Sequence, residues 1–157
     1  MHHELYIVTD LLTHLLLPPA KITEGFFRVG SVSLELAKRV QVATGLQVRG
    51  FEVVLDRSGI QHSFKQHGVG NAASEIAQGQ GPIEAADFLA LPEWLPAPEA
   101  VRPGQLRPGR QPMPCVEFYA TLPSGLTCAI LEFRPGRKRL ALVTMYKKNQ
   151  PHEQLVF

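Results

Sequence analysis

The sequence has few of the features that identify several large classes of protein. It contains only two cysteines, Cys115 and Cys128, and neither is part of a CxxC motif, which argues against a structural zinc site. Both cysteines fall in predicted strands, on the two sides of a predicted turn. The two could therefore lie opposite each other, but buried free thiols in a reducing compartment are the favoured interpretation.

A long apolar run is also missing. The stretch LLTHLLLPPA is too short and too interrupted to span a bilayer. The preceding MHHELYIVTD carries acids in place of the basic start of a secretory signal. We therefore expect a cytoplasmic protein with no membrane partner.

The net charge is small, +2, but it is unevenly distributed. Residues 102–157 contain nine Lys and Arg against three Asp and Glu, whereas residues 1–101 are net acidic. This asymmetry predicts a basic face built by the C-terminal part of the chain, and phosphate is a common ligand of such a face. A solvated surface that happens to be basic is the alternative.

What is present suffices for one compact domain, since 45% of the 157 residues are apolar. The clearest helix covers residues 31–45, with Ser31 or Ser33 as its N-cap and Gly45 as its end. The other predicted elements are a helix over 4–17, a short extended segment at 23–30, a strand over 46–56 with a break at Gly50, a short helix over 71–81, a helical turn and Pro-studded loop over 83–101, and an irregular connection over 102–114.

The C-terminal third predicts three adjacent antiparallel strands. The segments CVEFYATL, LTCAILEFRP and RLALVTMYKK are rich in β-branched and aromatic residues, and the turn signals PSG and PGRK separate them. The predicted helices come first in the chain and the β-meander comes last. This order predicts an α+β fold, in which a helical N-terminal part packs on an antiparallel sheet.

The stretch GIQHSFKQHG brings His62, Lys65 and His67 together. Proton transfer by the histidines, with Lys65 neutralising a phosphate oxygen, is the first interpretation. Metal binding is less favoured, because the five-residue spacing of the histidines does not aim both at one point on a helix or a strand. Ordinary helix capping and backbone contacts are the structural alternative.

The stretch LVTMYKKN is the second polar segment. On a strand, Thr144 and Tyr146 share one face, and Met145 and Lys147 share the other. A pair of hydroxyl groups beside lysines suits a phosphate, although a Thr–Tyr pair is equally common on a half-buried strand.

The order of these segments resembles the phage-borne nuclease-like domains of the barnase, EndoU, colicin E5/D and RelE type. The resemblance rests on the helix ending in TGL, HSFKQHG, DFLALPEWLPAPEAV and the closing LALVTMYKK, and it covers roughly residues 28–148. It implies a nuclease-like domain over 28–157, preceded by a helix and linker over 1–27.

The resemblance further implies metal-independent cleavage of RNA to a 2′,3′-cyclic phosphate, with no cofactor. The implied catalytic residues are His62, Lys65, His67, Thr144, Tyr146 and Lys147. His67 would be the general base or acid and His62 its counterpart. Lys65 and Lys147 would bind phosphate as cations, and Thr144 and Tyr146 would donate hydrogen bonds to it. The residues expected to steer RNA are Arg134, Arg137, Lys138 and Arg139.

The leading hypothesis is therefore a phage- or prophage-encoded endoribonuclease that acts as an effector or toxin in a host cytoplasm, or is carried in a phage particle. RNA is the expected partner, together with a cognate inhibitor protein or a phage structural protein. The alternative is a non-catalytic nucleic-acid-binding or phage-particle accessory domain of the same fold.

Overall fold

The computed structural model describes residues 26–56, 80–81, 85–105 and 113–148. The predicted helix over 4–17, the GIQHSFKQHG stretch and nearly all of the predicted helix over 71–81 lie outside these residues. The proposed domain boundary at residue 27 stays a prediction. None of the described helices has the length and apolarity needed to cross a bilayer.

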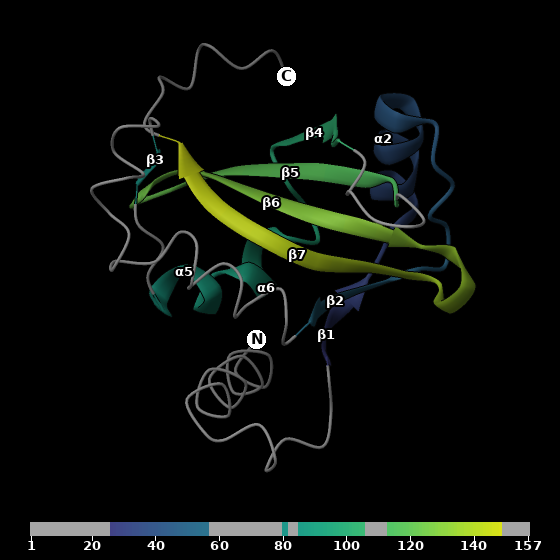
Figure 1. The fold of residues 1–157 in the computed structure, drawn as a ribbon, viewed down its shortest axis with the longest axis horizontal. Helices are drawn as coiled ribbons and strands as arrows, with labels where there is room; N and C mark the ends of the chain where they lie inside the picture. Colours follow the sequence, from purple (N-terminus) through teal and green to yellow (C-terminus); the bar gives the residue numbers. More distant parts are fainter. Residues whose placement is uncertain (1–25, 57–79, 82–84, 106–112, 149–157) are drawn as a thin grey trace.

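Seven strands form one sheet in the described part of the chain, in the order β1-β2-β7-β6-β5-β4, with the short β3 also paired to β7 (Figure 1). The strands are β1 (Phe26–Ser31), β2 (Glu52–Asp56), β3 (Gln80–Gly81), β4 (Ala100–Pro103), β5 (Cys115–Leu122), β6 (Gly125–Arg134) and β7 (Arg139–Lys148). The helices are α2 (Leu34–Thr44), α5 (Ala85–Leu89), α6 (Leu91–Trp94) and the 3-10 turn η3 (Pro135–Arg137).

The α+β fold and its C-terminal antiparallel meander of β5, β6 and β7 are confirmed. The sheet is larger than the meander, because β1 and β2 from the N-terminal half join it. β2 lies parallel to β7, whereas the other pairings are antiparallel, so the sheet is mixed. β7 therefore lies inside the sheet, between β2 and β6.

Helix α2 begins and ends as its sequence predicts. The Ser33 side chain accepts a hydrogen bond from the backbone N–H of Leu36 at 3.0 Å, which caps the first turn. Gly45 ends the helix in the left-handed region at φ 77°, where a glycine carries no steric penalty. The buried side of α2 consists of Leu36, Ala37 and Val40, and it packs the helix against the core.

The main core lies on one face of the sheet, which we call the core face, and the other face is called the second face. The core face packs against side chains of α2, α5 and α6. Burying this apolar surface is the main source of stability for the fold. The core residues of the meander and β2 are Val53, Leu55, Val116, Phe118, Ala120, Ala129, Leu131, Leu140, Leu142 and Met145.

A β-bulge in β7 changes which of its residues face the core. Leu131 of β6 pairs with Leu142, but the preceding Ile130 pairs with Thr144, so Val143 is an extra residue in β7. Before the bulge, Leu140 and Leu142 face the core, and after it, Met145 does. The bulge thus determines which face receives each side chain from residue 144 to residue 148.

Candidate active site

The structure places the predicted site residues in three groups. His62, Lys65 and His67 lie outside the described residues. Thr144 and Tyr146 lie on the second face of the sheet, as their spacing predicts, and Lys147 lies on the core side of the same strand.

Three rows of paired residues cross β5, β6 and β7 on the second face. Side chains of residues that pair across antiparallel strands lie on the same side and close together. The rows join Glu117 with Ile130 and Thr144, Tyr119 with Cys128 and Tyr146, and Thr121 with Leu126 and Lys148. We call the polar members other than the exposed Thr121 the second-face cluster: Glu117, Tyr119, Cys128, Thr144, Tyr146 and Lys148.

A carboxylate and an ammonium group are held in this cluster by the two tyrosines. The Tyr119 hydroxyl donates a hydrogen bond to Glu117 Oε1 at 2.6 Å, a short distance typical of a charge-assisted bond. The Lys148 Nζ atom lies 5.3 Å from the centroid of the Tyr119 ring and 5.9 Å from that of Tyr146. Both distances are within the range of cation–π attraction. The cluster therefore presents one positive group, the Lys148 ammonium, and one negative group, the Glu117 carboxylate, beside the side chains of the two tyrosines.

The hydroxyl and thiol groups of the cluster remain protonated at neutral pH. Burial, followed by the nearby Cys128, raises the pKa of both Tyr119 and Tyr146 well above the ordinary tyrosine value. Burial, followed by the charge of Glu117, raises the pKa of the Cys128 thiol to about 12. The tyrosines can therefore donate hydrogen bonds but do not act as bases, and Cys128 is not an activated nucleophile.

Thr144 carries a buried hydroxyl group. Its Oγ1 atom is inaccessible to solvent, and the described residues supply no partner for it. A buried polar atom left unpaired costs free energy, so such an atom in a native structure calls for an explanation. A hydrogen bond to a bound ligand would satisfy this one if the side chains that cover the oxygen moved aside.

Lys147 has a different environment from its neighbours in β7. Its Nζ atom lies 3.0 Å from Asp87 Oδ2, and the side chains of Lys147 and Asp87 are only 7% and 4% exposed. The Ser124 hydroxyl donates a hydrogen bond to Asp87 Oδ1 at 3.0 Å. The lysine on the second face beside Tyr146 is Lys148, so the role of phosphate cation fits Lys148 and not Lys147.

The predicted RNA-steering residues lie at the hairpin between β6 and β7. Arg134 pairs with Arg139 where β6 meets β7. The neighbouring pair, Phe133 and Leu140, faces the core, so Arg134 and Arg139 lie on the second face. Arg134 also forms an ion pair with Glu132 at 2.9 Å. Arg137 and Lys138 are exposed in the turn itself. Nine residues of β7 lie between the hairpin and Lys148. At about 3.3 Å per residue, the distance along the strand from the hairpin to Lys148 is about 30 Å.

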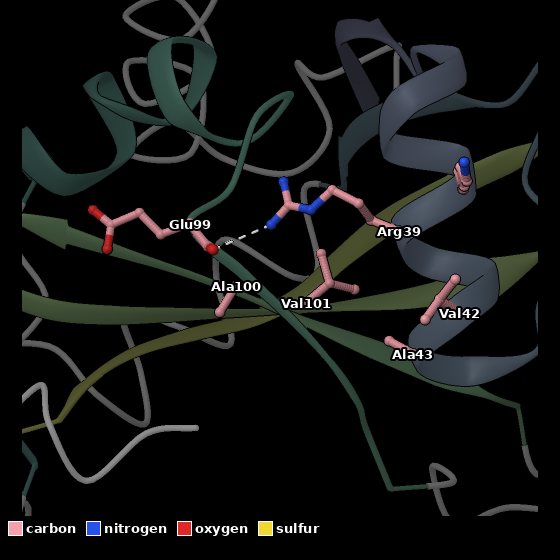
Figure 2. A pocket seen from close by; sticks show the side chains of 7 residues that line it. Arg39, Val42, Ala43, Glu99, Ala100 and Val101 are labelled. Carbon is pink, nitrogen blue, oxygen red and sulfur yellow. Dashed lines mark hydrogen bonds between the residues drawn. The ribbon is translucent and has the colours of Figure 1, made fainter. Parts of the chain in front are cut away.

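A cavity of about 350 Å³ lies between α2 and the outermost strand β4, and its lining includes Ala100, which pairs with Tyr119 (Figure 2). Arg39 crosses this region and donates hydrogen bonds to the carbonyl oxygens of Pro98 at 2.7 Å and Glu99 at 3.2 Å. The Glu99 carboxylate is bound by the Thr121 backbone N–H and hydroxyl. The charged groups here tie α2 to the edge of the sheet, and we assign them a structural role.

Within 26–56, 80–81, 85–105 and 113–148, no group of three or more His, Cys, Asp or Glu side chains is arranged to hold a metal ion. His62 and His67 lie outside that range. The two cysteines are buried and are not joined in a disulfide bond, as the sequence predicts.

The sequence alone did not point to Glu117, Cys128 and Lys148 as members of this cluster, and it offered Tyr119 only as one of several aromatic residues that could stack on a base. Lys148 directly follows the predicted site residue Lys147 in the sequence. It is two residues from Tyr146 and four from Thr144, and this spacing indicates that all three lie on one face of a strand. The other three lie on β5 and β6, and only the pairing of those strands with β7 brings them to the site.

A family model described as phage-Barnase-EndoU-ColicinE5/D-RelE like nuclease3 matches residues 30–154. The match contains every described element from α2 to β7, including the whole second-face cluster. It also contains His62, Lys65 and His67. No curated protein and no solved structure matches the chain.

Proposed function

Because the chain belongs to the phage-Barnase-EndoU-ColicinE5/D-RelE like nuclease3 family, and is therefore a nuclease, we propose that it is a metal-independent endoribonuclease. Its substrate is RNA, and its product carries a 2′,3′-cyclic phosphate. It requires no cofactor. In its host it acts as a phage- or prophage-encoded effector, with a cognate inhibitor protein as a candidate partner.

The observation that carries this proposal is the composition of the second-face cluster. A phosphodiester passing through its transition state gains negative charge on its non-bridging oxygens. Fixed hydrogen-bond donors and a cation stabilise that charge most when little water is present. Tyr146 and Thr144 are hydroxyl donors on half-buried strand positions, and Lys148 is the adjacent cation. This set supports phosphate binding on the second face.

The face also offers a path for the rest of the nucleic acid. Arg134 and Arg139 stand on the same face as the cluster, toward the hairpin end of β6 and β7. Arginine contacts with backbone phosphates add affinity and fix the position of the strand without reading its sequence. Arg137 and Lys138 extend the positive charge into the exposed turn.

The proposed reaction needs a base and an acid. The base removes the proton of the ribose 2′-hydroxyl, the 2′-oxygen forms a bond to phosphorus, and the bond from phosphorus to the 5′-oxygen breaks. The acid gives that 5′-oxygen its proton. We assign these roles to His67 and His62, with Lys65 as a second phosphate cation. Glu117 is a further candidate base, because its carboxylate lies on the cluster and is oriented by Tyr119.

The testing experiment is a cleavage assay on total host RNA with EDTA present. We expect discrete fragments ending in 2′,3′-cyclic phosphate, no cleavage of DNA of the same sequence, and loss of cleavage in His67→Ala and Lys148→Met. DNA lacks the attacking 2′-hydroxyl group. Cleavage that EDTA abolishes would contradict the metal-independent reaction. Intact RNA in the presence of a folded, RNA-binding wild type would favour the non-catalytic alternative.

A further inference from the structure

Arg102 lies on the second face of the sheet, in the outermost strand β4. It pairs with Glu117 of β5, and side chains of residues that pair across antiparallel strands lie on the same side of the sheet. Its neighbours agree with this direction, because Val101 packs against the main core and Ala100 belongs to the small cluster around Tyr119. Arg102 therefore lies beside the second-face cluster, one strand farther out.

The carboxylate opposite Arg102 does not neutralise its charge. The Glu117 carboxylate instead accepts a hydrogen bond from the Tyr119 hydroxyl of its own strand. Opposite charges that face each other across two strands usually attract and stabilise the sheet. Arg102 nevertheless forms no hydrogen bond or ion pair with any residue that the structure describes, and its side chain is only half-buried. The five N–H donors of its guanidinium group are therefore unused within the described part of the chain.

The other three arginines that the structure describes in strands all have partners. Arg28 and Arg134 each form an ion pair with a glutamate, at 3.2 Å and 2.9 Å. Arg139 also has an interaction with another part of the protein. A charge that is paired within the protein attracts an external anion less strongly, since the two opposite charges partly cancel. Of these four arginines, Arg102 is thus the one best able to bind an anionic ligand.

Arg102 and Lys148 approach Tyr119 from opposite sides. The ammonium group of Lys148 reaches the Tyr119 ring from β7, and Arg102 is the diagonal neighbour of Tyr119 on β4. Diagonal neighbours on adjacent strands lie about 7–8 Å apart, which is within the reach of a long side chain. A polyanion that crosses the sheet from β7 to β4 therefore meets a cation on each side of this tyrosine.

We propose that Arg102 is a further substrate-binding residue, which binds a backbone phosphate of a nucleic-acid strand that crosses the second face from Lys148 toward β4. A planar guanidinium group matches the geometry of a phosphate and can donate two parallel hydrogen bonds to it. A phosphate contact positions the strand and carries no sequence information. That this strand is RNA rests on the proposed ribonuclease function, whereas the phosphate contact itself does not.

The test measures the affinity of the full chain for a labelled single-stranded DNA over a range of salt concentrations. DNA has the phosphates of RNA without the 2′-hydroxyl group, so the proposed cleavage reaction does not consume it. Each phosphate that is neutralised on a single strand contributes about −0.7 to the slope of log affinity against log salt concentration. We expect Arg102→Met to make this slope less negative by about 0.7 and to weaken binding about tenfold at low salt, whatever the DNA sequence.

Two further variants separate the charge of Arg102 from its shape and its position. Arg102→Lys keeps the positive charge but not the planar guanidinium group, so its slope should equal that of the wild type while its affinity falls severalfold. Arg49→Met is the matched control, because Arg49 is exposed and lies beside α2, which packs on the core face. It should leave both the slope and the affinity unchanged. In the RNA assay, Arg102→Met should lower kcat/KM about tenfold, and Arg49→Met should not lower it.

A folded Arg102→Met that keeps the wild-type slope and affinity would overturn the proposal. An equal loss of affinity in Arg49→Met would also contradict it, because the loss would then be a general effect of net charge. The proposal fails as well if the wild type does not bind the DNA at low salt. A wild type that binds the DNA with the expected slope but cleaves no RNA would refute the proposed function and leave the phosphate contact of Arg102 standing.

Discussion

Single substitutions of the two neighbouring lysines should have opposite consequences. Lys147→Met should impair folding, and Lys148→Met should impair cleavage. The two substitutions are chemically identical and adjacent in sequence, so any difference between them comes from the environment of each side chain. Lys147 is buried against Asp87, whereas Lys148 is half-buried above two tyrosine rings.

The magnitudes follow from these environments. Lys147→Met leaves the Asp87 carboxylate buried without its ammonium partner, and breaking a buried pair in this way costs about 3–5 kcal/mol of unfolding free energy. Lys148→Met removes cation–π contacts at a half-exposed site, which are worth about 0.5–1 kcal/mol. Removing one group that stabilises charge in a transition state typically lowers kcat by about 10² to 10³. Lys148→Met should therefore lose about two to three orders of magnitude in kcat while remaining stable.

Two measurements on each variant check this prediction. Urea unfolding followed by circular dichroism gives the change in unfolding free energy, provided that the slope against urea concentration is unchanged. Cleavage of a labelled RNA then gives kcat for the folded fraction. Lys38→Met, on the exposed side of α2, is the control that reports the effect on stability of removing a surface lysine.

Equal behaviour of the two lysine variants would contradict these assignments. If both lose cleavage and neither loses stability, Lys147 acts at the substrate and its ion pair with Asp87 is not a structural feature. If Lys148→Met cleaves RNA at the wild-type rate, the second-face cluster is not the phosphate site.

Three further predictions concern single side chains. Thr144→Val should keep or raise stability by up to about 1 kcal/mol, because it removes a buried hydroxyl for which the described residues supply no partner. If that hydroxyl binds phosphate, the same substitution should slow RNA cleavage about tenfold. Urea unfolding and the cleavage assay measure the two effects. Stability should fall between pH 9 and 12, since the unfolded Cys128 thiol ionises at its ordinary pKa of 9.0 and the folded one at about 12. The contribution of the Cys128 thiol to stability is complete below pH 9 and lost above pH 12. The free energy of unfolding of Cys128→Ala, measured at pH 8, 10 and 11, should therefore decrease less steeply with pH than that of the wild type. Cys115 and Cys128 should resist a thiol reagent until the protein unfolds, because both are buried.

Local signals in the sequence predicted the elements that depend on neighbouring residues. Ser33 and Gly45 fix the ends of α2, and the turn residues between the last three strands fix the meander. The predicted strand over 46–56 is shorter in the structure, because Gly50 adopts φ 76° in a turn and β2 begins at Glu52.

The features that the sequence did not reveal depend on distant pairings. β4 falls in a segment rich in proline, and its four residues form a strand only because β5 is available beside them. The parallel pairing of β2 with β7 joins segments more than 80 residues apart. The second-face cluster has the same origin, since Glu117 and Tyr119 reach Thr144, Tyr146 and Lys148 through two strand registers.

The central position of β7 has a consequence for the synthesis of this protein. The ribbon of β1 and β2 meets the other strands through β7 alone in the described sheet (Figure 1). A nascent chain that lacks residues 139–148 has two separate pieces of sheet and no Tyr146 or Lys148. The sheet becomes continuous, and the proposed phosphate-binding residues come together, only after residues 139–148 have been added to the chain.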